Sequence, residues 1–396
     1  MGLRFTRGLL LPVLMAGPWA QADRRPQPAI SELEVDEDGL AILRVDLHPL
    51  GAEDRPRSFR FALDTGAALC VLDLSVPETL FWDDGARMRV RDCNGATSVM
   101  PLVSLKRVAV GGLIRDGVPA LRLDLKKGPT GKFQDEPVDG LLGMSFLDGT
   151  RFLLDMEQRQ LHWWAPAPAS GLRLPLHYGP DKSPRVSLRV GDRDVDGLVD
   201  TGRLAGLGLP WSLRPKGKGT ECLSGGAASV SSAAEELDLP EVGVAGGAWR
   251  NPPVLFQAGV DIGNVGMEVF APSRTGFDFL QHQLILIPGR DSALPLRPRS
   301  RQRLVLGWDR SGPVARLAIE HVFPDSAEQA AGFRAGDEIL QVGALTGSAL
   351  SRRAIRALVG QGQPLRWLLR RKGEPLDLIH PAPASPLLQT QRAAAP

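Results

Sequence analysis

The residues best suited to chemistry in this sequence are two aspartates in identical Asp-Thr-Gly triplets, at residues 64–66 and 200–202. A short hydrophobic run precedes each triplet, so each Asp is expected at the end of a buried strand. The Gly of each triplet permits a tight turn that a side chain would obstruct. Two carboxylates held close together on such turns cannot both ionise and therefore share a proton. One can then act as general base on a water while the other acts as general acid on a carbonyl, without metal or cofactor.

A second pair of motifs shows that this part of the sequence is duplicated. Residues 143–161 contain Gly-Met and then, twelve residues after the Gly, the pattern Asp-x-x-Gln-x-Gln-Leu. Residues 266–284 contain the same pattern at the same spacing. Because the copies are about 130 residues apart, they indicate two related lobes rather than a short-period repeat. Short apolar runs between turn signals, such as residues 40–45, 59–63 and 105–110, predict that the lobes are built from strands.

The first triplet, followed by Ala67 and by Leu-Leu-Gly at 141–143, resembles the retropepsin-like aspartic proteases, and so does the second, with Ile-Gly-Asn-Val-Gly at 262–266. The resemblance covers roughly residues 30–288. It implies an all-β bilobal acid-protease fold with lobes at 28–165 and 172–288, catalytic residues Asp64 and Asp200, and a downstream segment that threads under each active-site loop. Because both lobes lie in one chain, as in pepsin-like enzymes, a monomer could be complete. A peptide or protein substrate would lie between the lobes.

The two active-site loops differ at one position. The expected loop residues are Thr65, Gly66 and Ala67 in the first copy and Thr201, Gly202 and Arg203 in the second. The resemblance implies that the two Thr hydroxyls brace the loops against each other, and that a small residue follows each Gly. Arg203 departs from this pattern. A guanidinium beside the dyad would favour its fully ionised form and so weaken or acid-shift the activity, unless the side chain turns outward and pairs elsewhere.

Candidate flaps lie between the triplets and the threading segments. Asn94-Gly95 is a hairpin signal where the flap of the first lobe is expected, and Gly225-Gly226 is its candidate counterpart in the second. A pepsin-like flap would carry a Tyr, but the only Tyr of the chain is Tyr178, outside both hairpins.

The C-terminal block differs from the two lobes because strands and helices alternate in it. Strands are expected at 314–319, 338–342 and 365–370, and helices at 326–332 and 351–359. Residues 326–333 and 336–340 resemble bacterial PDZ domains, which implies a small α+β PDZ domain at 304–380 after a linker at 289–303. Its candidate peptide-binding residues are Leu306, Gly307 and Trp308 in a carboxylate-binding loop, and Ile355 and Leu358 on the helix. The domain would either bind a C-terminal peptide or only pack on the catalytic unit.

The ends of the chain and its composition indicate where the protein acts and which partners it does not favour. Residues 1–22 have a basic start, a short apolar core and Ala-Gln-Ala before residue 23, which predicts a cleaved signal peptide and export to the periplasm or the medium. No later segment is long and apolar enough to span a membrane. The leader arginines account for the net charge of +2, so nothing favours nucleic-acid binding. Residues 381–396 are expected to be disordered.

Three cysteines remain in the expected mature chain, Cys70, Cys93 and Cys222. One disulfide with one thiol and three buried thiols are both compatible with this number, and their spacing matches no zinc site. The motifs together predict an aspartic endopeptidase with a PDZ domain. The alternative is a peptide-binding scaffold that keeps the protease fold but has lost turnover through Arg203.

Overall fold

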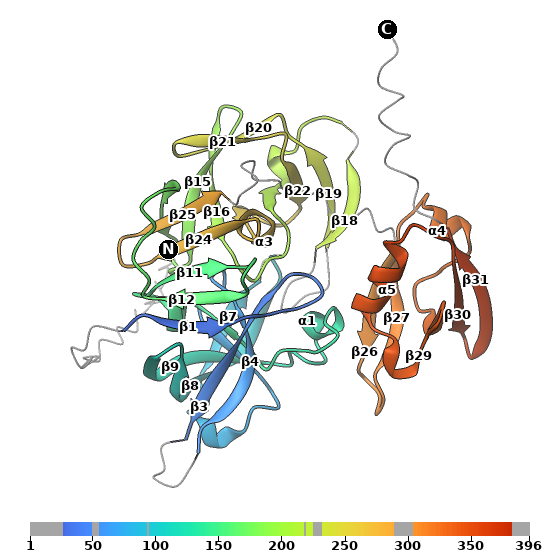
Figure 1. Ribbon diagram of the computed structural model, residues 1–396, viewed down its shortest axis with the longest axis horizontal. Helices are drawn as coiled ribbons and strands as arrows, with labels where there is room; N and C mark the ends of the chain where they lie inside the picture. Colours follow the sequence, from blue (N-terminus) through green and yellow to red (C-terminus); the bar gives the residue numbers. More distant parts are fainter. Residues whose placement is uncertain are drawn as a thin grey trace, which may run out of the picture.

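The computed structural model describes residues 27–49, 55–92, 95–217, 219–224, 232–288 and 304–381. The expected signal peptide, the linker at 289–303 and all but the first residue of the expected tail lie outside these ranges. The chain is mostly β-sheet, with 51% of it in strands, as the sequence predicts. Four sheets are present in the described part (Figure 1). No helix among the described residues has the length and apolar character to cross a membrane.

The nine-stranded sheet carries the first Asp-Thr-Gly triplet. Its order is β2-β3-β4-β10-β5-β9-β8-β6, with β7 paired to β8. Its strands are β2 (Glu34–Val35), β3 (Ala41–His48), β4 (Arg57–Leu63), β5 (Cys70–Asp73), β6 (Phe81–Trp82), β7 (Arg87–Arg91), β8 (Thr97–Val110), β9 (Leu113–Leu123) and β10 (Gly140–Leu142). Short helices η1 (Glu78–Leu80), α1 (Pro129–Lys132) and α2 (Met144–Leu147) interrupt them.

The ten-stranded sheet carries the second triplet. Its order is β18-β19-β22-β17-β23-β16-β15-β20-β21, with β14 paired to β15. Its strands are β14 (His177–Tyr178), β15 (Pro184–Val190), β16 (Arg193–Val199), β17 (Leu207–Pro210), β18 (Thr220–Ser224), β19 (Ser232–Asp238), β20 (Glu241–Val244), β21 (Gly247–Arg250), β22 (Pro253–Gln257) and β23 (Gly263–Val265). Helices η2 (Trp211–Leu213) and α3 (Met267–Phe270) accompany them.

Strand pairing repeats between these two sheets. In the first, β4 pairs in parallel with β10, β10 antiparallel with β5, and β5 in parallel with β9. In the second, β16 pairs in parallel with β23, β23 antiparallel with β17, and β17 in parallel with β22. The duplication seen in the sequence is therefore also a duplication of topology around each triplet.

A six-stranded sheet joins the two copies, and each contributes three strands to it. Its order is β1-β12-β11-β24-β25-β13. The strands are β1 (Ala29–Glu32), β11 (Arg151–Asp155), β12 (Gln160–Trp163), β13 (Leu172–Pro175), β24 (Ser273–Asp278) and β25 (Gln283–Pro288). The central contact is the antiparallel pair of β11 with β24.

The repeated Asp-x-x-Gln pattern forms the hairpin turns of this sheet. The carboxylate of Asp155 accepts the backbone N–H of Gln158, and the carboxylate of Asp278 accepts that of Gln281. The residue after each Gln has a positive φ angle, as the tight turn requires. The motif is thus conserved between the copies because each Asp holds the turn of its hairpin.

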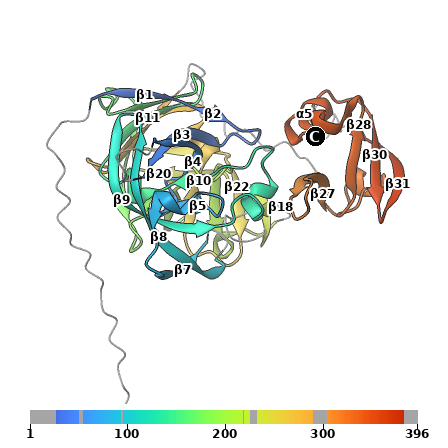
Figure 2. The same cartoon turned by 90° about the horizontal axis from the view of Figure 1, so that it is seen from below.

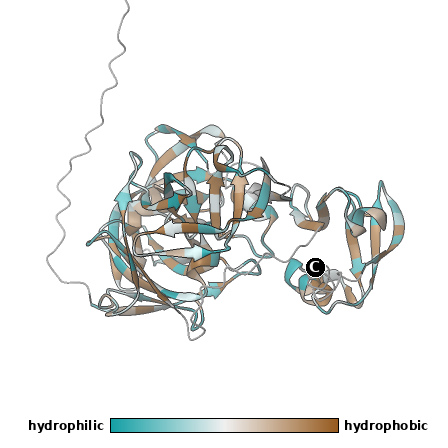
Figure 3. Cartoon of the chain, turned by 90° about the horizontal axis from the view of Figure 1, so that it is seen from above, coloured by the Kyte–Doolittle hydropathy of each residue, from teal (hydrophilic) through white to brown (hydrophobic). Residues whose placement is uncertain are grey.

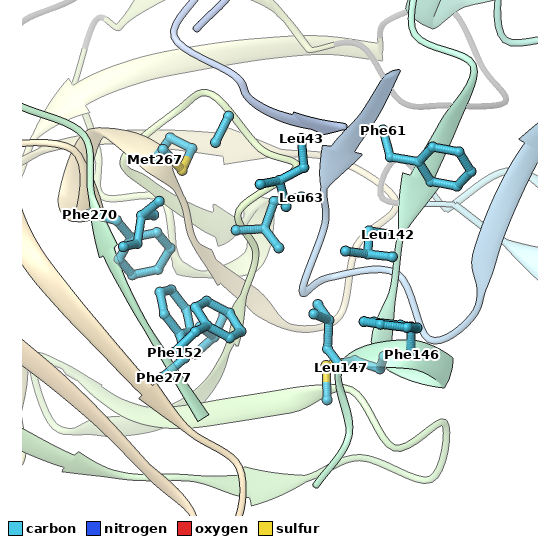
Figure 4. Close-up of a cluster of buried hydrophobic side chains, with 14 of the residues drawn as sticks. Leu43, Phe61, Leu63, Leu142, Phe146, Leu147, Phe152, Met267, Phe270 and Phe277 are labelled. Atoms are coloured by element: carbon cyan, nitrogen blue, oxygen red, sulfur yellow. The ribbon is translucent and has the colours of Figure 1, made fainter. Parts of the chain in front are cut away.

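Hydrophobic side chains of both copies share one core. Hydrophobic and hydrophilic residues alternate along many strands, so one face of each sheet turns inward (Figure 3). Phe152 of β11 and Phe277 of β24 stack with ring centroids 4.8 Å apart. Leu63 and Leu142, which flank the first triplet, lie in the same cluster (Figure 4). The core thereby fixes the strands that deliver both aspartates.

Residues 304–380 fold around a separate core. The sheet order is β26-β27-β28-β30-β31, with β29 paired to β28. The elements are β26 (Leu304–Asp309), β27 (Arg316–Val322), α4 (Ala327–Ala330), β28 (Glu338–Val342), β29 (Leu345–Thr346), η3 (Gly347–Ala349), α5 (Arg352–Val359), β30 (Leu365–Arg371) and β31 (Glu374–His380). This C-terminal module lies beside α1 of the larger β body (Figures 1 and 2). Trp367 and Phe333 are buried at its centre.

Candidate active site

Two pairs of parallel strands deliver the aspartates to one point. β4 ends immediately before Asp64, and β16 ends immediately before Asp200. The backbone N–H of Asp64 donates to the carbonyl of Leu142 on β10, at 3.1 Å. The backbone N–H of Asp200 donates in the same way to Val265 on β23, at 2.9 Å. The predicted threading segments therefore lie directly against the two triplets.

The threonines brace the two loops reciprocally, as the family resemblance implied. The Thr65 hydroxyl donates to the carbonyl of Val199 at 2.7 Å and accepts the N–H of Thr201 at 3.1 Å. The Thr201 hydroxyl donates to the carbonyl of Leu63 at 2.8 Å and accepts the N–H of Thr65 at 3.0 Å. Both threonine side chains are fully buried. Since each hydroxyl joins residues more than 130 positions away, this network fixes one carboxylate relative to the other.

The glycines leave room for the carboxylates to meet. A Cβ on Gly66 would lie 2.3 Å from the carboxyl carbon of Asp200, and a Cβ on Gly202 would lie 2.5 Å from that of Asp64. No side chain fits at either distance. The glycine of each loop is thus required by the aspartate of the other loop.

Asp64 is held by its own loop. One of its carboxylate oxygens, Oδ1, accepts the backbone N–H groups of Gly66 at 3.1 Å and Ala67 at 3.0 Å. The small Ala67 offers no side-chain donor, so the two backbone groups are the local support for this carboxyl group.

Among the described residues, Asp200 has a side-chain amide donor for which Asp64 has no counterpart. Its Oδ1 accepts the N–H of Gly202 at 2.9 Å, and its Oδ2 accepts the side-chain amide of Asn264 at 3.1 Å. Asn264 lies in the threading strand β23 at the position that Leu141 occupies in β10 of the first copy. The Asp-Thr-Gly motifs do not point to Asn264 as a site residue. A polar residue within an otherwise apolar, buried threading strand was the available signal.

Burial and mutual repulsion raise the pKa values of the pair. Desolvation, reinforced by the Asp200 charge, raises the pKa of Asp64 to about 8. Desolvation also raises the pKa of Asp200, but the Asn264 amide, the Arg203 charge and the Gly202 N–H act against it. The Asn264 amide and the Arg203 charge act on Asp200, so the environment favours the shared proton on Asp64.

The Arg203 side chain pairs with a buried side chain on a strand of the second copy. Its guanidinium hydrogen-bonds to the side-chain oxygen of Gln257 on β22. Gly208 makes space for it, because a Cβ there would lie 2.8 Å from a guanidinium nitrogen. Its charge still lowers the pKa of Asp200. Arg203 therefore pairs elsewhere, and its charge also acts on the dyad; its effect on activity stays a prediction.

One predicted flap lies within reach of the opposite copy. β7 and β8 form an antiparallel hairpin that contains Gly95, whose φ angle is +82°. A Cβ on Gly95 would lie 2.3 Å from the carbonyl oxygen of Gly259. Arg91 on this hairpin donates to the same carbonyl at 2.8 Å and pairs with Asp261 at 2.8 Å. Asn94, Gly225 and Gly226 lie outside the described residues.

The remaining candidate residues lie away from the dyad. Leu306, Gly307 and Trp308 form part of β26, paired with β27, and Ile355 and Leu358 lie in the core of the C-terminal module. Cys70 is a buried thiol whose pKa is raised by desolvation, and Cys222 is also a thiol, while Cys93 lies outside the described residues. Within the described ranges, no group of three His, Cys, Asp or Glu side chains could hold a metal ion.

Comparison with known proteins agrees with this geometry in the first copy. Residues 52–146 match the family model of the aspartyl proteases. The match includes Asp64, its loop and the threading strand β10, and it ends within α2. No curated protein matches the chain. An aspartyl protease domain is thus supported over the first copy, which in turn supports a peptidase function.

Proposed function

We propose that this chain is an aspartic endopeptidase of bilobal architecture whose catalytic dyad is Asp64 and Asp200. The observation that carries the proposal is the convergence of two carboxylates on matched glycine turns, braced by reciprocal hydrogen bonds of Thr65 and Thr201. A single Asp-Gly turn between strands needs neither the brace nor the opposed carboxylate. The substrate is a peptide or protein that lies between the copies under the β7–β8 hairpin.

The two aspartates take different roles in this proposal. Asp200, which accepts the Asn264 amide, is the ionised general base that removes a proton from the attacking water. Asp64, whose pKa is raised to about 8, is the general acid that protonates the scissile carbonyl oxygen. The resulting tetrahedral intermediate collapses with cleavage of the C–N bond and protonation of the leaving amine. Because the pair shares its protons, apparent pKa values belong to the dyad as a whole.

Two further elements of the proposal rest on the sequence, the first on a family resemblance and the second on the pattern of the leader. The C-terminal module is a PDZ-type domain that assists substrate or partner binding; its strand and helix order supports this assignment. Export to the periplasm or the medium rests on the leader at residues 1–22. The enzyme is expected to act as a monomer, since one chain supplies both aspartates.

The test is cleavage by the expected mature protein, residues 23–396, of a diverse peptide mixture between about pH 3 and 8, with products identified by mass spectrometry. Asp64→Asn and Asp200→Asn are each expected to abolish the cuts. Asp192→Asn is the matched control, because this exposed aspartate lies on the β15–β16 hairpin that also carries Asp200. It should leave cleavage unchanged.

The alternative function is a peptide-binding scaffold without turnover. It draws on Arg203, whose charge favours the fully ionised dyad in which no general acid remains. Uncut peptides that nevertheless bind to the protein at every pH would favour the scaffold. Cuts that persist in both Asp→Asn variants would refute the dyad itself.

A further inference from the structure

The C-terminal module contacts the larger β body at the connection that leads into the threading strand β10. This connection, residues 124–139, joins β9 to β10 and contains α1, which lies against β26 of the module. In the second copy, the shorter segment 258–262 joins β22 to β23. A longer connection loses more conformational entropy when it is ordered, so β10 depends more on outside support than β23 does.

Arg310 of the module holds one turn of this connection by its backbone. Its guanidinium donates to the carbonyl of Gly131, and to those of Gln134 and Asp135 at 2.7 Å and 3.0 Å. The planar group suits this role, because its several donors have fixed directions and can reach several carbonyls at once. The half-buried guanidinium also lies over the Trp308 ring, 5.4 Å from the centroid. Since all three carbonyls belong to the backbone, Arg310 fixes the path of the chain at residues 131–135.

The Asp135 side chain holds the same turn against the start of α5. Its Oδ1 accepts the backbone N–H of Arg352 at 2.8 Å and the indole N–H of Trp308 at 2.9 Å. Its Oδ2 accepts the backbone N–H of Arg353 at 3.0 Å. The Arg352 side chain also pairs with Glu37 of the β body at 3.0 Å, and each of these two side chains is only 4% exposed. Because removal of either partner would leave a buried charge unpaired, this pair opposes separation of the module from the β body.

The backbone that the module holds continues directly into the active site. Four residues further along, the carboxylate of Asp139 accepts the backbone N–H of Arg60 at 2.9 Å, and the Asp139 N–H donates to the Arg60 carbonyl at 2.8 Å. β10 begins at the next residue and pairs in parallel with β4. The carbonyl of Leu142 on β10 then accepts the backbone N–H of Asp64. One short, continuously hydrogen-bonded stretch of chain thus links the module to a catalytic aspartate.

We propose that the C-terminal module positions the catalytic dyad: Arg310 and the start of α5 hold residues 131–135, which keeps β10 paired with β4 and in support of Asp64. Arg310 is therefore a positioning residue, because it acts on Asp64 only through β10. This inference goes beyond the proposed function, which gives the module a part in binding alone. Its effect on cleavage rests on the proposed function, whereas its effect on the order of β10 does not.

The experiment compares the wild type, residues 23–396, with Arg310→Ala by hydrogen exchange and by cleavage of one identified peptide substrate. Backbone amides of residues 138–142 should exchange at least about tenfold faster in the variant, because the loss of Arg310 lets this stretch open locally. Amides of residues 258–265, the equivalent stretch of the second copy, should keep their rate and serve as the internal control. We expect kcat to fall at least about tenfold and KM to change less than about threefold, because a small displacement of a catalytic group lowers the rate more than it lowers binding.

Two further variants sharpen the test. Arg310→Lys keeps the charge and part of the hydrogen bonding, so both effects should be smaller, and it replaces Arg310→Ala if that variant does not fold. Arg316→Ala should behave as the wild type, because this exposed arginine of the module pairs with Glu338 of the module itself.

Three outcomes would overturn the proposal. The first is unchanged exchange at 138–142 in Arg310→Ala, and the second is equal acceleration at 258–265, which would indicate general destabilisation. The third is a raised KM with unchanged kcat, which would give the module a part in substrate binding alone. If the wild type cleaves no peptide, the proposed function fails, and the exchange rates alone decide whether the module orders β10.

Discussion

Replacing Asn264 by Leu tests whether the Asn264 amide makes Asp200 more acidic than Asp64. The change gives β23 the residue that β10 has at Leu141, and it removes the side-chain donor to Asp200. The Asn264 amide stabilises the ionised form of Asp200, so its loss makes protonation of the pair easier. The apparent pKa at which the dyad becomes fully protonated should therefore rise. The acid limb of the pH–rate profile should move to higher pH.

The size of the shift follows from the hydrogen bond. A hydrogen bond to a charged group contributes about 1.5–3 kcal/mol, and one pKa unit corresponds to about 1.4 kcal/mol. The expected shift is therefore about 1–2 units. Solvent should do little to reduce it, because Asp200 is only 6% exposed and Asn264 7%. The Arg203 charge remains in the variant and still lowers the pKa of Asp200.

The assay is the initial rate of cleavage of one identified substrate from about pH 2.5 to 8, for the wild type, Asn264→Leu and the control Leu141→Val. The control alters packing in the equivalent strand without changing any donor to the dyad. Stability should not suffer in Asn264→Leu, because the Asn264 Oδ1 is buried without a hydrogen-bond partner among the described residues. An acid limb that moves by less than about 0.3 unit in a folded, active variant would refute the assigned role.

Three further outcomes are expected. The Arg203 cation lowers the pKa of Asp200, so Arg203→Ala should raise that pKa and extend activity to higher pH. Arg203→Lys keeps the charge and should shift the pH–rate profile less. Identical profiles of the wild type and both variants would contradict this electrostatic role. Thr65→Ala should lower the free energy of unfolding in urea by about 2–4 kcal/mol, because it leaves the Val199 carbonyl and the buried N–H of Thr201 unpaired. Thr65→Ser keeps the hydroxyl and should lower it by less than about 1 kcal/mol. Burial raises the pKa of Asp36 to about 6, so ionisation of this carboxyl destabilises the fold as the pH rises from about 4 to 6. Asp36→Asn should therefore raise the free energy of unfolding by up to about 3 kcal/mol at pH 7.5 and by little at pH 4. Urea unfolding at both pH values measures the difference.

Local chemistry made much of the fold predictable. The strand at 338–342 has the predicted bounds, and the helix expected at 351–359 begins one residue later because Ser351 is its N-cap. Turn residues and alternation act within a few positions, so the sequence shows them directly. The strand predicted at 105–110 is longer, because pairing with β7 and β9 extends β8 over Thr97–Val110. Cross-strand pairing of this kind is set by partners far away in the chain.

The sequence by itself determined the pair of triplets, the glycines that each turn needs and the duplication that makes two aspartates available. Only the tertiary structure decided what surrounds them. The amide of Asn264 reaches Asp200, Arg203 turns to Gln257, and Asp135 fills the end of α5. These contacts join residues from 54 to 217 positions apart. Pattern and propensity describe a segment, whereas the charge state of a buried group depends on which other segments the fold packs against it.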